Sequence, residues 1–147
     1  MRVSLFAVIV GSLAMPAQAA PSGYELFLLA CDGRTDCQRV ADIVLGADGQ
    51  KSEYATPGVD VRIEPLSALV DGTNIRMSMS LNPHQLGAAM RDTGRASGSQ
   101  VSIQIDSAPL RHAYYSPIAV FSSANKIYQV WGRLSAVRAM AKGMVVR

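Results

Sequence analysis

The sequence predicts an α+β fold, a two-layer sandwich in which helices cover one face of an antiparallel or mixed sheet. Two observations support this fold class. Apolar and polar residues alternate over several short stretches, which is the period-two pattern of half-buried strands. Between those stretches apolar residues recur at helical spacing, so that the C-terminal half follows the order strand, helix, strand, strand, helix. Each layer would bury its apolar side against the other.

Residues 1–19 have the three parts of a bacterial secretory signal peptide. Arg2 supplies the basic start, residues 3–15 are mostly apolar, and Ala17-Gln18-Ala19 is a small-x-small cleavage triplet. The apolar run is interrupted before it reaches the roughly 20 residues that a transmembrane helix needs. We therefore expect residues 20–147 to form a single α+β domain, located in the periplasm or outside the cell, with no transmembrane segment in the mature chain.

Residues 23–30 are apolar and rich in strand formers, and they precede a turn-prone Asp-Gly pair, so a strand is expected there. Residues 38–45 fit either a strand or a short helix, because their aliphatic side chains suit both patterns. Residues 46–58 contain three glycines and a proline with charged residues between them, which predicts an exposed loop.

Two strands with strict alternation follow. The first covers residues 59–64 and is expected to end at Pro65, after which residues 66–70 fit one helical turn. The second covers residues 75–81. The side chains expected to face the core are Val59, Val61, Ile63, Ile75, Met77, Met79 and Leu81.

Asn82 and Pro83 predict the start of a helix, because Asn caps free amides and Pro is tolerated at the first helical position. Apolar residues then recur at helical spacing over residues 86–93, and a glycine follows. A strand over residues 99–105 leads into a predicted turn at residues 106–109.

Residues 110–123 are mixed in pattern, and Pro117 argues against one continuous central strand there. Residues 126–131 predict a further strand that Gly132 closes. The last predicted element is a helix over residues 135–144, with a serine as its cap and a stripe of apolar residues.

Cys31 and Cys37 are the only two cysteines of the 147-residue chain. In an oxidising compartment they would close a ring of about seven residues, worth roughly 2 to 2.5 kcal/mol in the chain-entropy model. Redox and zinc motifs separate their cysteines by two residues, so the wider spacing here predicts a structural disulfide. The residues before Cys31 also look like a lipoprotein box, but the apolar core of the leader lies too far upstream for one membrane-inserted segment.

Charge is unevenly distributed. Residues 21–72 contain nine acidic and four basic side chains, whereas residues 73–147 contain nine basic and two acidic ones. Either the two halves pack together and neutralise each other, or the second half presents a basic face to an acidic partner, an anionic lipid surface or an unfolded polypeptide. No nucleic-acid partner is expected, because the basic residues are dispersed singly and an exported protein does not meet that ligand.

The sequence contains no clear catalytic constellation. His84 and His112 are the only histidines, and neither has a second histidine or a carboxylate at metal-ligand spacing. A nucleophile elbow and a Gly-rich phosphate loop are both missing. We therefore expect no metal, no cofactor and no enzymatic activity. An enzyme that uses His112 with Asp106 is the minor alternative, which no motif supports.

The C-terminal half combines several motifs of one known family. The matching residues are Thr93, Gly98, Ile103-Gln104-Ile105-Asp106, Ser107-Ala108-Pro109, and Val130-Trp131-Gly132-Arg133-Leu134-Ser135 leading to Ala139. In this combination residues 74–144 resemble the periplasmic head subdomain of SecD/SecDF, the accessory component of the bacterial Sec translocon. Two departures stand out: Ser107 replaces the usual glycine after the strand aspartate, and the membrane domain of that family has no counterpart here.

The resemblance implies a mobile module that contacts polypeptides in protein export and is not an enzyme. Its candidate contact residues lie in the irregular segment 110–125, where His112 accompanies three aromatic residues, Tyr114, Tyr115 and Phe121. We therefore predict an exported, non-enzymatic binding or accessory protein with a protein or polypeptide partner. The alternative is a periplasmic inhibitor or immunity protein, a class built on small stapled domains whose activity lies in one loop.

Overall fold

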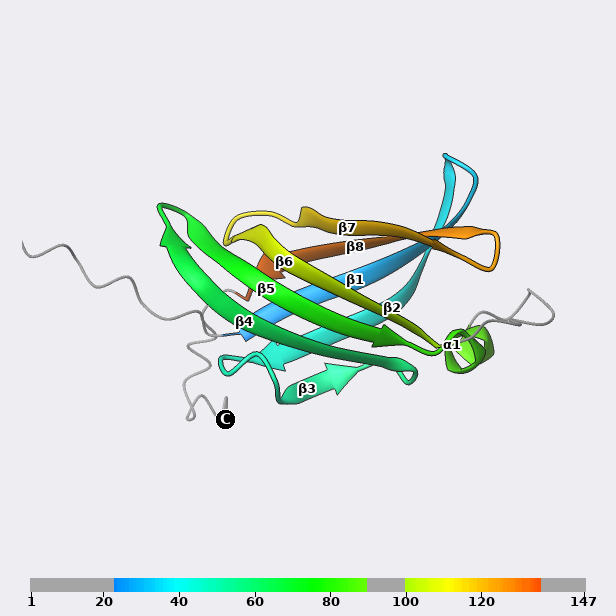
Figure 1. Cartoon of the computed structure of the whole chain (residues 1–147), viewed down its shortest axis with the longest axis horizontal. Helices are drawn as coiled ribbons and strands as arrows, with labels where there is room; N and C mark the ends of the chain where they lie inside the picture. Colours follow the sequence, from blue (N-terminus) through cyan, green and yellow to red (C-terminus); the bar gives the residue numbers. More distant parts are fainter. Residues whose placement is uncertain (1–22, 90–99, 136–147) are drawn as a thin grey trace, which may run out of the picture.

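The structure is a computed structural model, and it describes residues 23–89 and 100–135. This part of the chain forms two antiparallel sheets and one short helix (Figure 1). The larger sheet has the strand order β3-β2-β1-β8-β7 and the smaller sheet the order β4-β5-β6. The strands are β1 (Gly23–Asp32), β2 (Asp36–Gly46), β3 (Ser52–Ala55), β4 (Val59–Leu69), β5 (Gly72–Leu81), β6 (Val101–Arg111), β7 (Ser116–Ser123) and β8 (Lys126–Leu134).

The predicted α+β fold class is wrong. Among the described residues the only helix is α1 (Pro83–Ala89), and no helical layer covers either sheet. The apolar side of each sheet is covered by the other sheet, since buried residues of both sheets form one hydrophobic cluster. Helices are unnecessary as a second layer when the N-terminal half supplies four strands of its own.

The core-facing residues of two strands were predicted correctly. The alternating residues of β4 and β5 are at most 8% exposed, and they are Val59, Val61, Ile63, Ile75, Met77, Met79 and Leu81. They meet the inward residues of β1, among them Leu26 and Leu28, in the shared cluster. Burying each such side chain contributes about 1.5 to 3 kcal/mol relative to exposure, so these rows dominate the stability of the sandwich.

Three predicted strand ends are placed too early, and prolines explain two of them. β4 continues past Pro65 to Leu69, and β6 continues through Pro109, where a turn was predicted. Both strands lie at the edges of the three-stranded sheet, where a proline need not donate to a neighbour, and both ladders shift register nearby. Residues 66–69 are therefore strand instead of a helical turn, and Val70 lies in the turn between β4 and β5. β8 likewise runs through Gly132, which is buried.

The ambiguous segment 38–45 is strand, within β2. The predicted loop over residues 46–58 contains the short edge strand β3. Gly49 anchors this loop to the other sheet, because its carbonyl accepts a hydrogen bond from the Ile63 amide at 2.8 Å. Its φ of 67° favours glycine, and a Cβ there would lie 2.1 Å from the Ile63 carbonyl oxygen.

The predicted helix start at Asn82 is confirmed. Its side-chain oxygen accepts a hydrogen bond from the His84 amide at 3.2 Å. The helix α1 lies at one end of the sandwich (Figure 1), and its Leu86 is fully buried. The predicted signal peptide at residues 1–19, the end of this helix and the predicted helix over residues 135–144 lie wholly or largely outside the described residues. Within the described ranges, no helix has the length and apolar character needed to cross a membrane.

Candidate functional site

The outer face of the five-stranded sheet carries more apolar and aromatic side chains than an exposed sheet face needs. Alternate residues of β1 point away from the core, so Glu25, Phe27 and Leu29 face outward between the buried positions. In the sheet, Phe27 of β1 pairs with Trp131 of β8 on one side and with Asp42 of β2 on the other. Outward side chains on paired positions of neighbouring strands therefore form rows that run across the strands of this face.

Three rings meet in the centre of this face. The Phe27 ring lies 4.9 Å from that of Tyr115, edge to face at 66°, and 6.3 Å from that of Trp131, nearly parallel at 3°. The Arg39 guanidinium lies 4.5 Å from the Phe27 centroid, and that of Arg133 lies 4.6 Å from the Tyr115 centroid. We call these five residues the aromatic–arginine cluster. Ring pairs and cation–π contacts at these distances are favourable.

Each arginine of the cluster is held by a carboxylate. Arg39 pairs with Asp42, with 2.7 Å between its Nε and the carboxylate Oδ1. Arg133 donates to Glu25 through Nε at 2.7 Å and through a terminal nitrogen at 2.6 Å. A guanidinium has five N–H groups, so each arginine keeps donors that its carboxylate does not use. The carboxylates fix the orientation of the guanidinium planes while leaving part of each plane available.

Glu25 is the hub of a hydrogen-bond network that links β1, β8 and the loop before β7. Besides Arg133, it accepts from the Tyr115 hydroxyl at 3.1 Å and from the Ser135 hydroxyl at 3.4 Å. Partial burial opposes ionisation of Glu25, but these bonds and the charge of Arg133 outweigh it and keep the carboxyl pKa below its usual value. Burial, followed by the bond to Glu25, raises the pKa of Tyr115. The network therefore holds Glu25 ionised and Tyr115 protonated.

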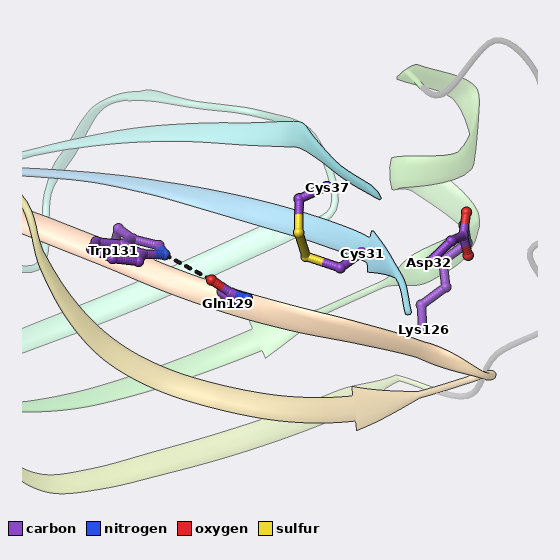
Figure 2. Close-up of a disulfide and its surroundings, with 6 residues drawn as sticks. All are labelled: Cys31, Asp32, Cys37, Lys126, Gln129 and Trp131. Atoms are coloured by element: carbon purple, nitrogen blue, oxygen red, sulfur yellow. Dashed lines mark hydrogen bonds and ion pairs between the residues drawn. A yellow bond between two sulfur atoms is a disulfide. The ribbon is translucent and has the colours of Figure 1, made fainter. Parts of the chain in front are cut away.

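Trp131 presents a fixed edge to this face. Its indole Nε1 donates to the Gln129 side-chain oxygen at 3.2 Å, two residues earlier on β8 (Figure 2). Beyond the cluster, Tyr54 of β3 and Val120 of β7 are 59% and 66% exposed. Aromatic rings and arginines at the centre of a patch are the composition that distinguishes protein interfaces from other surface.

The structure separates the four residues that sequence patterns singled out. Tyr115 belongs to the aromatic–arginine cluster. Phe121 instead faces the core side, where it stacks on Tyr128 with 5.2 Å between centroids. His112 and Tyr114 are exposed in the loop between β6 and β7, and the His112 amide donates to the Asp71 carbonyl of the β4–β5 turn at 3.3 Å. Contact of these four residues with a partner stays a prediction.

Four cluster members were not predicted from the sequence as contact residues: Phe27, Trp131, Arg39 and Arg133. One local signal was available, because Phe27 alternates with buried residues of β1 and must therefore point outward. The contact of Phe27 with Trp131 depends on the pairing of β1 with β8, which joins segments about a hundred residues apart. No local pattern encodes that pairing.

The predicted disulfide is present. Cys31 and Cys37 face each other in the β1–β2 ladder and are bonded, with 4.0 Å between their Cα atoms (Figure 2). The bond closes the tip of the β1–β2 hairpin, in which every residue from Asp32 to Arg39 is exposed. At its base, Lys126 of β8 donates to both carboxylate oxygens of Asp32 at 3.0 Å. A disulfide is compatible with an oxidising compartment.

Ion pairs between the two halves of the chain favour mutual neutralisation over a wholly basic face. Three pairs join an acid of the first half to a base of the second, and they are Glu64 with Arg76, Asp32 with Lys126 and Glu25 with Arg133. Within the described ranges, no group of three or more His, Cys, Asp or Glu side chains is arranged to hold a metal ion.

Comparison with known proteins identifies no relative: no family model, no curated protein and no solved structure matches this chain. The likeness to the SecD/SecDF head subdomain therefore stays a prediction from motifs, while the α+β fold that accompanied it is contradicted by the two-sheet architecture.

Proposed function

We propose that the chain is an exported, non-enzymatic binding protein of the cell envelope, whose aromatic–arginine cluster contacts a polypeptide partner. The observation that carries the proposal is the ring series Trp131, Phe27 and Tyr115 between two guanidinium groups on an outward sheet face. Rings of this kind offer a large, rigid apolar surface, and the unused arginine N–H groups can donate to backbone carbonyl oxygens.

Three further features support this function. The three-part leader at residues 1–19 favours export, and the Cys31–Cys37 bond suits an oxidising compartment. The motif likeness of residues 74–144 to the head subdomain of SecD/SecDF favours a polypeptide as the partner. The apolar side chains of Tyr54 and Val120 extend the contact surface on both sides of the cluster, to the edge strands β3 and β7.

The test uses the only tryptophan of the chain, Trp131, which lies within the proposed site. The exported chain is titrated with an unfolded polypeptide that lacks tryptophan, such as reduced and carboxamidomethylated ribonuclease A. A saturable change in Trp131 emission is expected, with a Kd in the range of about 1 μM to 1 mM. Unchanged emission over this range would contradict the proposal.

A matched pair of arginine variants locates the contact. Arg39→Gln removes the guanidinium that covers Phe27, and Arg76→Gln is its control, because the two side chains are similarly exposed at 51% and 47% and each pairs with one carboxylate. Arg39→Gln is expected to weaken binding about 5-fold, which corresponds to the roughly 1 kcal/mol of an exposed cation–π or hydrogen-bond contact. The opposite ranking of the two variants would place the polypeptide on the other sheet and refute the proposed site.

The stapled hairpin tip favours one second candidate, an inhibitor or immunity protein that acts through a single loop. The tip is exposed over eight consecutive residues, Asp32 to Arg39, and projects from the sheets in Figure 1. In a pull-down from the periplasm, this candidate predicts capture of a hydrolase or toxin that is lost on Arg34→Ala. Capture of unfolded exported chains that is insensitive to Arg34→Ala would support the lead proposal instead.

A further inference from the structure

The outer face of the three-stranded sheet is hollowed along its middle. Its central strand β5 carries the small side chains of Ser78 and Ser80 on this face. In the row of Ser78 the flanking side chains are longer, namely Arg62 of β4 and Gln104 of β6. In the next row Ser80 lies between Asp60 of β4 and the small Ser102 of β6. Small residues between long ones make a trough that follows the direction of β5, which we call the polar trough.

Three adjoining hollows make up this trough. They measure about 450, 340 and 250 Å³. The first two share Arg62, Ser78 and Gln104, and the last two share Asp60 and Ser80. At about 3.3 Å per residue, the distance along β5 from the row of Arg76 to the row of Ser80 is roughly 13 Å. The trough is therefore an elongated site and not a spherical pocket.

The trough offers unpaired hydrogen-bonding groups of both kinds. Within the described ranges, Asp60, Arg62 and Ser102 form no ion pair and no side-chain hydrogen bond, although they line the same hollow. Other lining groups are already paired: Arg76 donates to Glu64 at 3.0 Å. The free carboxylate accepts hydrogen bonds, the free guanidinium donates them, and the hydroxyl does both.

The formal charges of the described residues that line the trough sum to zero, because Asp60 and Glu64 balance Arg62 and Arg76. A lining without net charge favours an uncharged ligand over a strongly charged one. The complementary ligand is elongated, uncharged and able both to donate and to accept at many positions. Hydroxyl groups have this property, and a planar carboxylate or guanidinium can bind two neighbouring hydroxyls at once.

We propose that the polar trough binds a neutral oligosaccharide, with Asp60 and Arg62 as the main hydrogen-bonding residues and Ser78 as the floor. The site lies on the sheet opposite to the aromatic–arginine cluster, so it is independent of the polypeptide contact proposed above. The protein would then contact a glycan through one sheet and a polypeptide through the other.

The test is a titration of the isotope-labelled exported chain, followed by amide chemical shifts in nuclear magnetic resonance spectra. The probes are chitohexaose, built from N-acetylated sugars, and maltohexaose, a plain glucan, each added to about 10 mM. Shifts confined to β4, β5 and β6 with a Kd of about 1 mM are expected for at least one probe, and the one that binds identifies the glycan class. Absence of shifts with both probes, or shifts around Trp131 instead, would overturn the proposal.

Two variants test the residues directly. Ser78→Gln fills the floor of the trough, and Asp60→Asn keeps the shape while removing the carboxylate; each is expected to weaken binding about tenfold. Ser122→Gln is the matched control, because Ser122 is an exposed strand serine on β7 of the other sheet. Equal affinity of all three variants and the unsubstituted chain would refute the site, and unchanged amide spectra away from the substitution exclude misfolding as the cause.

Discussion

Phe27→Leu tests whether the aromatic–arginine cluster acts as one unit. Leucine keeps much of the apolar area but removes the ring that contacts Tyr115 at 4.9 Å, Trp131 at 6.3 Å and Arg39 at 4.5 Å. Each ring pair contributes about 0.5 to 1.5 kcal/mol and an exposed cation–π contact about 0.5 to 1 kcal/mol. Since leucine recovers part of the packing, the expected loss in the free energy of unfolding is about 2 kcal/mol.

The assay is urea unfolding followed by Trp131 emission, with circular dichroism as a second probe of the sheets. In thermal unfolding, a loss of about 2 kcal/mol lowers the melting temperature by roughly 8 °C in a domain of this length. Tyr54→Leu is the control, because Tyr54 is an exposed aromatic residue of the same sheet face without a ring contact among the described residues. It is expected to change stability by no more than about 0.5 kcal/mol. Equal effects of the two substitutions would refute the cooperative cluster.

Three other substitutions probe the charge network, the disulfide and the core. Glu25→Gln is expected to lower the free energy of unfolding by about 1 kcal/mol at pH 7, a value reduced by solvent screening. Because the pKa of the Glu25 carboxyl is lowered in the folded state, this stabilisation is present above about pH 4.5 and is lost as the pH falls. Urea unfolding at pH 3 should therefore show a smaller difference between the variant and the unsubstituted chain, and an equal difference would contradict the network. Replacing Cys31 and Cys37 together with serine is expected to cost roughly 2 kcal/mol, and a reducing agent should lower the unfolding midpoint of the unsubstituted chain but not of the variant. Gly132→Ala places a Cβ 2.6 Å from the Ile118 Cδ1 atom, which predicts a loss of about 1 kcal/mol in the free energy of unfolding, measured by thermal unfolding. Ile118→Val removes that atom, so adding it to Gly132→Ala should restore part of the lost stability. If the losses of the two substitutions are strictly additive in the double variant, the contact is not the cause.

Local alternation predicted which side chains face the core, but it did not predict the fold class. The inward positions of β4 and β5 follow from the two-residue period of a strand, a rule that needs no knowledge of the neighbouring strand. The fold class depends on which strands pair. β1 pairs with β8 across nearly the whole chain, and nothing in either segment alone specifies that partner.

Prolines misled the prediction for a related reason. Pro65 and Pro109 were interpreted as strand breakers, and each in fact lies within an edge strand. Pro117 was expected only to exclude one continuous central strand, and it lies in the edge strand β7. A proline breaks a strand only where its missing N–H would have served a neighbour. Whether a strand is central or at an edge is a property of the assembled sheet, so the sequence pattern could not distinguish the two cases.

The candidate site was only partly visible from the sequence, for the same physical reason. Tyr115 was singled out as one aromatic residue of an irregular segment. Its partners Phe27 and Arg133 lie 88 residues before it and 18 residues after it. Arg133 reaches it through the pairing of β7 with β8, and Phe27 through the further pairing of β8 with β1. Phe121 was grouped with Tyr115 because both are aromatic, yet the ring of Phe121 serves the core.

The two outer faces of the sandwich differ in chemistry, and this difference supports separate roles for them. On the three-stranded sheet, outward positions of β5 are Arg76, Ser78 and Ser80, as expected for a surface that stays in water. On the five-stranded sheet, Phe27 and Trp131 occupy equivalent outward positions, although the inner face already supplies the core. Outward rings are not required to cover that core, and a grouped apolar surface promotes association. This difference is the reason that the polypeptide contact is proposed for the five-stranded face and the hydrogen-bonded glycan for the three-stranded face.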